Sequence, residues 1–300
     1  MRATLRTLAL ASMVLAGACS DSTGPGPGQT LVLSFTGLEP LANGYHYEGW
    51  ALVGGQARAT GKFNIDATGK LVTVSGAPIA EGAFDTGIDL GSTSAIVITI
   101  EPTGDTDAVP TSTHILAGAV SGGAAPLTVG ASLAFGNSFS SAAGNYILAT
   151  PTNGNNNNEL SGIWFLSLAT GSPTVGLTLP TLPAGWVYEG WAVVGGRPVT
   201  TGRFTSVSGA DQSAPFSGPM AGPPFPGEDF LVNAPTGLSF PTSLVGGTGV
   251  ISIEPQPDDS PAPFTLKPLV GMISATATDH VTYSLGNNAA GFPTGTAIIR

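Results

Sequence analysis

The chain has 300 residues, of which 42% are hydrophobic and only 9% are charged, with 43 Gly and 25 Pro. Its formal net charge is −10, and its nine Lys and Arg form no cluster, which excludes a basic groove for nucleic acid. High hydrophobicity with low charge also excludes an intrinsically disordered chain. No segment has a convincing helical period, so we expect many short strands joined by turns.

The N-terminus has the three-part layout of a secretory signal. Two arginines precede an apolar run from Leu8 to Ala16, which is too short for a stable transmembrane helix. The run leads into LAGAC, which resembles a bacterial lipobox, whose cysteine is lipidated and becomes the first mature residue. A lipobox usually has Leu where Ala16 stands. We predict a signal peptide over residues 1–18 and a lipid anchor on Cys19.

Cys19 is the only cysteine, so an internal disulfide is excluded. Lipidation accounts for this residue, and secretion without a lipid is the alternative. The following SDSTGPGPGQT is polar and rich in Gly and Pro, which predicts a flexible linker over residues 19–30. We therefore expect the protein in the bacterial cell envelope, attached to the membrane through its lipid and facing the periplasm or the exterior.

A motif of 17 residues occurs twice in the chain. YEGWALVGGQARATGKF begins at Tyr47, and YEGWAVVGGRPVTTGRF begins 141 positions later, at Tyr188. A second pair follows, with IVITIEP in the first copy and GVISIEP in the second, at an offset of 153. The second copy therefore has 12 extra residues, which we place in the loop-like stretch SGPMAGPPFPGEDF. Each copy is long enough to hold its own core, so the repeat indicates tandem domains and not a solenoid.

Short strand-like runs alternate with Gly- and Pro-rich turns in both copies, which is typical of antiparallel sandwiches and barrels. We predict an all-β fold with two tandem antiparallel β-sandwich domains over residues 31–170 and 171–300. The boundary lies within residues 150–175, where an Asn-rich turn precedes a strand-like run.

The order of these motifs resembles the extracytoplasmic C-terminal domain of anti-sigma-K factors. YEGW, a glycine turn, TGxF, a strand ending in IEP and a Pro-containing loop before LxG occur in this order in both copies. The resemblance implies a shared fold and a sensing or partner-binding surface. Members of that family also carry a cytoplasmic helical domain and a transmembrane helix. This sequence shows neither, so we expect no direct contact with a sigma factor.

The glycine pair within each 17-residue motif predicts the turn of a β-hairpin. A three-residue loop would place Glu48 opposite Lys62 and Glu189 opposite Arg203, whereas a two-residue loop would move Lys62 to the other face. The exchange of Lys for Arg opposite a constant Glu predicts two structural ion pairs. If exposed, each pair would contribute about 0.2–1 kcal/mol.

The aromatic residues of the motif have two interpretations. The same three-residue loop places Trp50 opposite Thr60. Tyr47, Trp50, Tyr188 and Trp191 fit either the core of a sandwich or a platform on which sugar rings stack.

A catalytic or metal-binding role for Glu48 and Glu189 requires partners that both copies share. His46 stands near Glu48, but the second copy has Val187 at that position, and no two histidines have a metal-binding spacing. The acidic loops GDTDAVP and QPDDSPAP fall short of the six or more oxygen ligands that Ca²⁺ needs, which favours solvated turns. We therefore predict no catalytic residue, no metal and no cofactor.

These observations predict a non-enzymatic exported lipoprotein with a protein-binding, envelope-sensing or structural role. Its partner would be an unknown envelope protein or surface ligand, and nucleic acid is excluded. The alternative is a carbohydrate-binding or adhesive surface module, which requires exposed rings at Trp50, Trp186 and Trp191.

Overall fold

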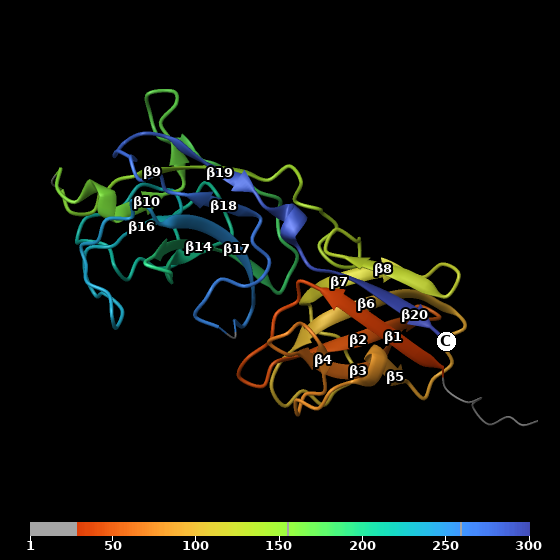
Figure 1. The fold of residues 1–300 in the computed structure, drawn as a ribbon. Helices are drawn as coiled ribbons and strands as arrows, with labels where there is room; N and C mark the ends of the chain where they lie inside the picture. Colours follow the sequence, from red (N-terminus) through yellow and green to blue (C-terminus); the bar gives the residue numbers. More distant parts are fainter. Residues whose placement is uncertain (1–28, 155, 259) are drawn as a thin grey trace, which may run out of the picture.

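The computed structural model describes residues 29–154, 156–258 and 260–300, and shows two β-rich lobes (Figure 1). The predicted signal peptide, Cys19 and nearly all of the linker lie outside these residues. The described residues contain no α-helix, only three short 3₁₀ turns at Ala80–Gly82, Glu159–Ser161 and Ala289–Gly291. None of their helices has the length and apolar character to cross a bilayer. The prediction of an all-β fold is confirmed.

The first lobe holds a nine-stranded antiparallel sheet in the order β4-β3-β2-β6-β7-β8-β20-β1-β5. Eight of its strands come from the first part of the chain, and the ninth is the C-terminal strand β20. The strands are β1 (Thr30–Thr36), β2 (His46–Val53), β3 (Gln56–Ile65), β4 (Leu71–Val72), β5 (Ala83–Asp85), β6 (Thr93–Glu101), β7 (His114–Ala119), β8 (Ala124–Thr128) and β20 (Thr294–Ile299).

The second lobe holds a second antiparallel sheet in the order β15-β14-β17-β18-β19-β9-β10-β16, with β13 also paired to β9. A separate two-stranded ribbon joins β11 to β12. These strands are β9 (Ala143–Leu148), β10 (Gly162–Trp164), β11 (Leu166–Ser167), β12 (Thr174–Val175), β13 (Leu177–Thr178), β14 (Trp186–Val194), β15 (Arg197–Phe204), β16 (Gly227–Asp229), β17 (Thr248–Pro255), β18 (Leu269–Met272) and β19 (Tyr283–Asn287).

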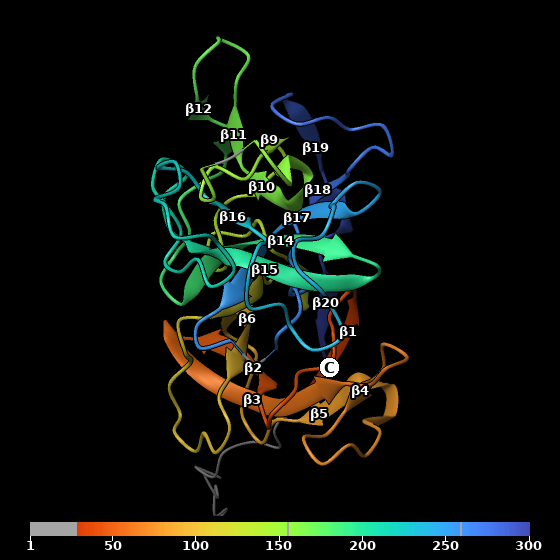
Figure 2. The same cartoon turned by 90° about the vertical axis from the view of Figure 1, so that its left-hand side faces the viewer.

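The two sheets have the same strand order, but each lobe is completed by a strand from the other repeat. By order, β2, β3, β6, β7 and β8 correspond to β14, β15, β17, β18 and β19. At the next position the first sheet has β20 and the second has β9. Along the chain β9 follows β8 and β20 follows β19, so each repeat sends its closing strand to the opposite lobe (Figures 1 and 2).

This exchange means that the predicted boundary at residue 170 does not separate the two sheets. Strands β9 and β10 precede residue 170 but belong to the second sheet, whereas β20 lies at the end of the chain and belongs to the first. The second sheet is a continuous stretch of chain inserted between β8 and β20 of the first.

Each sheet folds back on itself, so that its two halves face each other around apolar side chains. In the first sheet, β1 and β3 are far apart in strand order, yet the rings of Phe35 and Phe63 stack with centroids 5.3 Å apart. Phe84 of β5 also lies against Phe63, at 5.8 Å. Most buried apolar residues of both lobes belong to one core cluster, in which Trp186 packs against Phe135 across the junction at 4.8 Å. Two smaller buried clusters, one around Trp164 and one around Trp50, are separate from it.

Candidate functional site

The repeated motif folds into a hairpin with a two-residue turn in each lobe, where we expected a three-residue loop. Val53 pairs with Gln56, so only Gly54 and Gly55 form the first turn. Their φ angles are 59° and 79°, and a type I′ turn needs positive φ at both positions. The second hairpin, β14–β15, has the same turn.

A β-bulge in β3 shifts the strand pairing by one residue and so offsets the effect of the shorter turn. Trp50 pairs with Ala59, and not with Thr60 as we expected, because Thr60 is an extra residue in its strand. The extra residue shifts the pairing by one. Glu48 consequently lies opposite Lys62, as the longer loop would have placed it. In the second hairpin the corresponding bulge brings Glu189 opposite Arg203.

The glycine of YEGW makes room for this bulge. A Cβ atom at Gly49 would lie 2.5 Å from Oγ1 of Thr60, and one at Gly190 would clash with Oγ1 of Thr201. The bulge therefore requires Gly on β2 and β14, which explains why this position is Gly in both copies.

The Tyr of the motif faces the core, and the Glu faces the opposite side of the sheet. Tyr47 stacks on Phe63 at 5.5 Å, and Tyr188 stacks on Phe204 at 5.6 Å. The phenol of Tyr47 donates a hydrogen bond to the carbonyl of Glu39 at 2.9 Å. Alternation along the strand then places the Glu side chains on the outer face, beneath the loops that follow β6 and β17.

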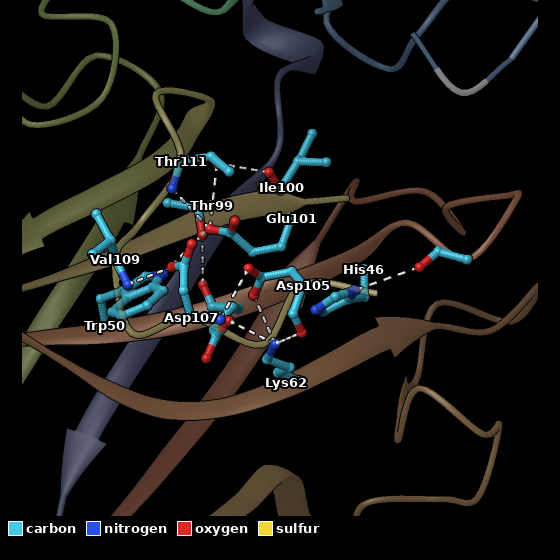
Figure 3. Close-up of polar contacts among 12 residues, drawn as sticks. His46, Trp50, Lys62, Thr99, Ile100, Glu101, Asp105, Asp107, Val109 and Thr111 are labelled. Atoms are coloured by element: carbon cyan, nitrogen blue, oxygen red, sulfur yellow. Dashed lines mark hydrogen bonds and ion pairs between the residues drawn. The ribbon is translucent and has the colours of Figure 1, made fainter. Parts of the chain in front are cut away.

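In the first lobe, Lys62 joins two acids, and Figure 3 shows it beside one of them, Asp105. Its Nζ lies 2.7 Å from Oδ2 of Asp105 and 3.6 Å from Oε2 of Glu48. It also donates to the carbonyl of Asp105 at 2.7 Å. Asp105 belongs to the loop after β6, so this cluster fastens that loop to the hairpin.

The second lobe repeats the arrangement with Arg203. Its Nε lies 2.9 Å from Oε2 of Glu189, and its Nη2 lies 2.5 Å from Oδ2 of Asp258. Thr200 Oγ1 donates to the other carboxylate oxygen of Glu189 at 2.5 Å. We name these two groups the acid–base clusters: Glu48, Lys62 and Asp105 in the first lobe, and Glu189, Arg203 and Asp258 in the second.

One Asp of each acidic loop is buried, which we did not expect, whereas Asp107 and most other described residues of the first loop are exposed, as in a solvated turn. The side chains of Asp105 and Asp258 are only 9% and 7% exposed, and each pairs with the base of its cluster. Glu48 and Glu189 are also buried, at 2% and 4% exposed. Both ion pairs are therefore largely buried, and the contribution of about 0.2–1 kcal/mol expected for an exposed pair does not apply to them.

A second polar chain runs beside each cluster. Trp50 Nε1 donates to Thr99 Oγ1 at 2.8 Å, and that hydroxyl donates to the carboxylate of Glu101. Glu101 Oε1 also accepts the backbone N–H of Thr111 at 3.1 Å. The Glu of the IEP motif therefore holds the loop that follows its own strand.

The second lobe builds the same chain from Trp191, Ser252 and Glu254. Trp191 Nε1 donates to Ser252 Oγ at 2.7 Å, and Ser252 donates to Glu254. Glu254 also accepts the N–H of Phe264 at 3.0 Å. The sequence alone suggested no role for these IEP glutamates, although their repetition in both copies is a usable signal.

Burial shifts the ionisation of several of these acids. Burial raises the pKa of Glu48 to about 7, against the opposing charge of Lys62. Burial likewise raises the pKa of Glu254 to about 8. The pKa of Asp105 is lowered, chiefly by the hydrogen bond from Lys62.

Glu254 makes the stability of the protein depend on pH. Its folded-state pKa of about 8 lies above the unfolded value of 4.5, so the folded state retains a proton that the unfolded state releases. This contribution to stability is complete below pH 4.5 and is lost as the pH rises through 8. We expect a higher urea midpoint at pH 5 than at pH 8.5, and a smaller difference for Glu254→Gln. An unchanged difference in that variant would contradict this assignment.

The extra residues of the second copy contribute a third polar group, and not only the loop that we expected. They end in strand β16, which pairs with β10, and there Glu228 and Asp229 are fully buried. Asp229 accepts Trp164 Nε1 at 2.7 Å and the N–H of Thr152 at 2.8 Å. Burial raises the pKa of Glu228 to about 7 and that of neighbouring Asp211 to about 8.

Two cavities adjoin these groups in the second lobe. One, of about 390 Å³, is lined by Trp191, Phe216 and the second acid–base cluster. The other, of about 240 Å³, is lined by Trp164, Asp211 and the residues inserted in the second copy.

The tryptophans do not form an exposed platform. Trp50, Trp186 and Trp191 are 0%, 4% and 3% exposed, so the aromatic residues of the motif are core residues. The carbohydrate-binding alternative required these rings in solvent and therefore loses its basis.

The three histidines have different surroundings. His114 Nδ1 lies 2.7 Å from the carbonyl of Leu133, and His280 is exposed beside Asp279. His46, in contrast, is buried and groups with Glu48 and Asp105, which the sequence spacing did not reveal. Within the described residues, no side-chain hydrogen bond links a histidine to a serine or threonine hydroxyl, as a nucleophile–base pair would need.

Comparison of the chain with protein-family models, with curated proteins and with solved structures finds no match.

Proposed function

We propose that the protein is a non-enzymatic exported lipoprotein whose two lobes act as a protein-binding or structural module of the cell envelope. One observation supports this proposal above the others. In both lobes the repeated Glu is buried and paired with a base, and the same base holds an acid of the covering loop. The polar groups that recur are thus engaged in holding loops on the sheets.

Catalysis by the repeated acids is disfavoured by the same contacts. A retaining or inverting glycosidase needs two carboxylates free to act on a sugar between them. Here Glu189 is bonded by Arg203 and Thr200, and Glu48 lies against Lys62. Because the carboxylates are engaged in ion pairs, a partner would contact the outer loops and not the carboxylates.

The N-terminal sequence supports export and anchoring. An apolar run follows two arginines and ends in LAGAC, and a Gly- and Pro-rich linker separates Cys19 from the first strand. The order of the motifs in both copies resembles that of anti-sigma-K extracytoplasmic domains, and this resemblance implies a sensing or partner-binding surface. In this proposal the partner is an envelope protein or a surface ligand and not a sigma factor.

The proposal is tested by expressing the wild-type chain and Cys19→Ser in a bacterial host with labelled palmitate. Wild type should incorporate label and sediment with membranes, whereas Cys19→Ser should do neither. Cross-linking in the native envelope should then join the wild-type protein to a defined partner in a reproducible ratio.

Two results would contradict the proposal. Equal palmitate labelling of both proteins would refute the anchor. A hydrolase activity that Glu48→Ala or Glu189→Ala abolishes, with the fold intact by circular dichroism, would refute the non-enzymatic role.

A further inference from the structure

The first acid–base cluster contains a histidine that its counterpart lacks. One ligand atom from each of His46, Glu48 and Asp105 lies within 4.8 Å of the others. His46 and Glu48 are two residues apart on β2, so their side chains point to the same face of the sheet. Asp105, in the loop after β6, lies close to both of them, and Figure 3 shows it beside His46. His46 is 3% exposed and Glu48 is 2% exposed, so the group is enclosed by protein.

The imidazole of His46 is oriented as a ligand would be. Its Nδ1 lies 3.4 Å from the carbonyl of Gly44, which fixes the ring and leaves Nε2 on the side of the carboxylates (Figure 3). Nε2 is buried and has no hydrogen-bond partner among the described residues, and the same holds for Glu48 Oε2. A backbone carbonyl behind one ring nitrogen and a free lone pair at the other is the usual arrangement of a metal-bound histidine.

Lys62 now supplies the positive charge of this group. Its Nζ lies 2.7 Å from Asp105 Oδ2 and 3.6 Å from Glu48 Oε2. The Lys62 side chain is 30% exposed, and its long flexible stem can turn the ammonium group outward into solvent. If the ammonium group moved away, two carboxylates and an imidazole would surround the position that it left. The charge of the two carboxylates would then balance that of a divalent ion.

We propose that His46, Glu48 and Asp105 bind a divalent transition-metal ion, represented by Zn²⁺, in exchange for the Lys62 ammonium group. Imidazole nitrogen and carboxylate oxygen are ordinary ligands of Zn²⁺. Ca²⁺ is disfavoured because it takes six to eight oxygen ligands. Ligand atoms around a tetrahedral zinc ion lie roughly 3.4 Å apart, given bonds of about 2.1 Å. The ligand atoms, now within 4.8 Å of one another, therefore have to approach by up to about 1.4 Å, which rotation of the Glu48 and Asp105 side chains can supply.

The second lobe is a built-in comparison. Val187 replaces His46, and Arg203 bonds both Glu189 and Asp258 through separate nitrogens. A planar guanidinium held at two points is harder to displace than an ammonium group. We therefore expect one zinc site per chain, and not two.

The test is isothermal titration of the purified protein with Zn²⁺ in a buffer that does not chelate metals, with metal analysis of the dialysed protein. Wild type should bind about one equivalent. His46→Val places in the first lobe the residue found in the second, and should weaken binding at least ten-fold with an unchanged circular dichroism spectrum. Lys62→Met removes the competing cation and should tighten binding about ten-fold.

Each outcome decides the proposal. One equivalent bound by wild type, lost in His46→Val and strengthened in Lys62→Met, supports it. Zinc binding that His46→Val leaves unchanged assigns the metal elsewhere and overturns it, as does the absence of binding by wild type. If Lys62→Met does not fold, His46→Val against wild type alone decides.

Discussion

A chain that ends at residue 293, and so lacks β20, should lose its first sheet although the missing strand belongs to the second repeat. β20 lies between β8 and β1, so its removal leaves two unpaired edges in the middle of the sheet. Leu31, Leu33 and Leu127 on these neighbours are at most 1% exposed and would lose their cover. We expect a loss of more than about 5 kcal/mol, which corresponds to roughly 10–20 °C in melting temperature.

Hydrogen exchange locates the damage. Amides in residues 30–128 should exchange quickly in the shortened chain, while those of β14, β17 and β18 should retain more protection. Deletion of Arg300 alone is the control and should have little effect. If the shortened chain aggregates, Ala297→Asp replaces it, because Ala297 is 1% exposed at the centre of β20. If protection were lost only in the second lobe, each repeat would complete its own sheet, and the exchange of closing strands would be refuted.

Arg203→Met should destabilise the protein by about 3 kcal/mol in urea unfolding at pH 7. The substitution leaves Glu189 and Asp258 without their shared base, with side chains only 5% and 7% exposed. Breaking a buried ion pair costs about 3–5 kcal/mol, and we expect the lower end because 37% of the Arg203 side chain is in solvent. The loss should exceed the range of about 0–1 kcal/mol for surface pairs.

Two further variants separate the charge interaction from the packing of the arginine stem. Arg203→Lys copies the base of the first lobe and should recover most of the stability. Glu189→Gln combined with Arg203→Met should cost less than the sum of the two single changes, because the uncompensated acid is gone. Additive losses across this double-mutant cycle would show that Arg203 acts through packing alone.

The hairpin shows how a prediction can reach the right pairing by a wrong route. Glycine pairs and opposite charges predicted that Glu48 faces Lys62. The structure uses a tighter turn and compensates with a bulge at Thr60. A bulge is hard to predict from one sequence, because it depends on whether the facing residue leaves room for the extra side chain. Here Thr60 occupies the space that a Cβ atom at Gly49 would need.

The burial of the acids could not be predicted in the same way. Asp105 and Asp258 lie in segments whose composition is typical of solvated turns. Only the folded chain brings Lys62 and Arg203 beneath those turns, and only there does the loop close over Glu48 and Glu189. The proximity of His46 to Asp105 has the same origin, since His46 lies on β2 and Asp105 lies in the loop after β6.

The sequence by itself determined the all-β class, the duplication and the residues that form each hairpin, because these follow from local propensity, turn chemistry and repetition. Tertiary structure decided where the two closing strands go and which charges become buried. An antiparallel strand can pair with any edge of matching pattern, and in a duplicated protein two such edges are nearly alike. The choice between β8 and β19 as the neighbour of β20 depends on the path of the whole chain, and local sequence does not encode it.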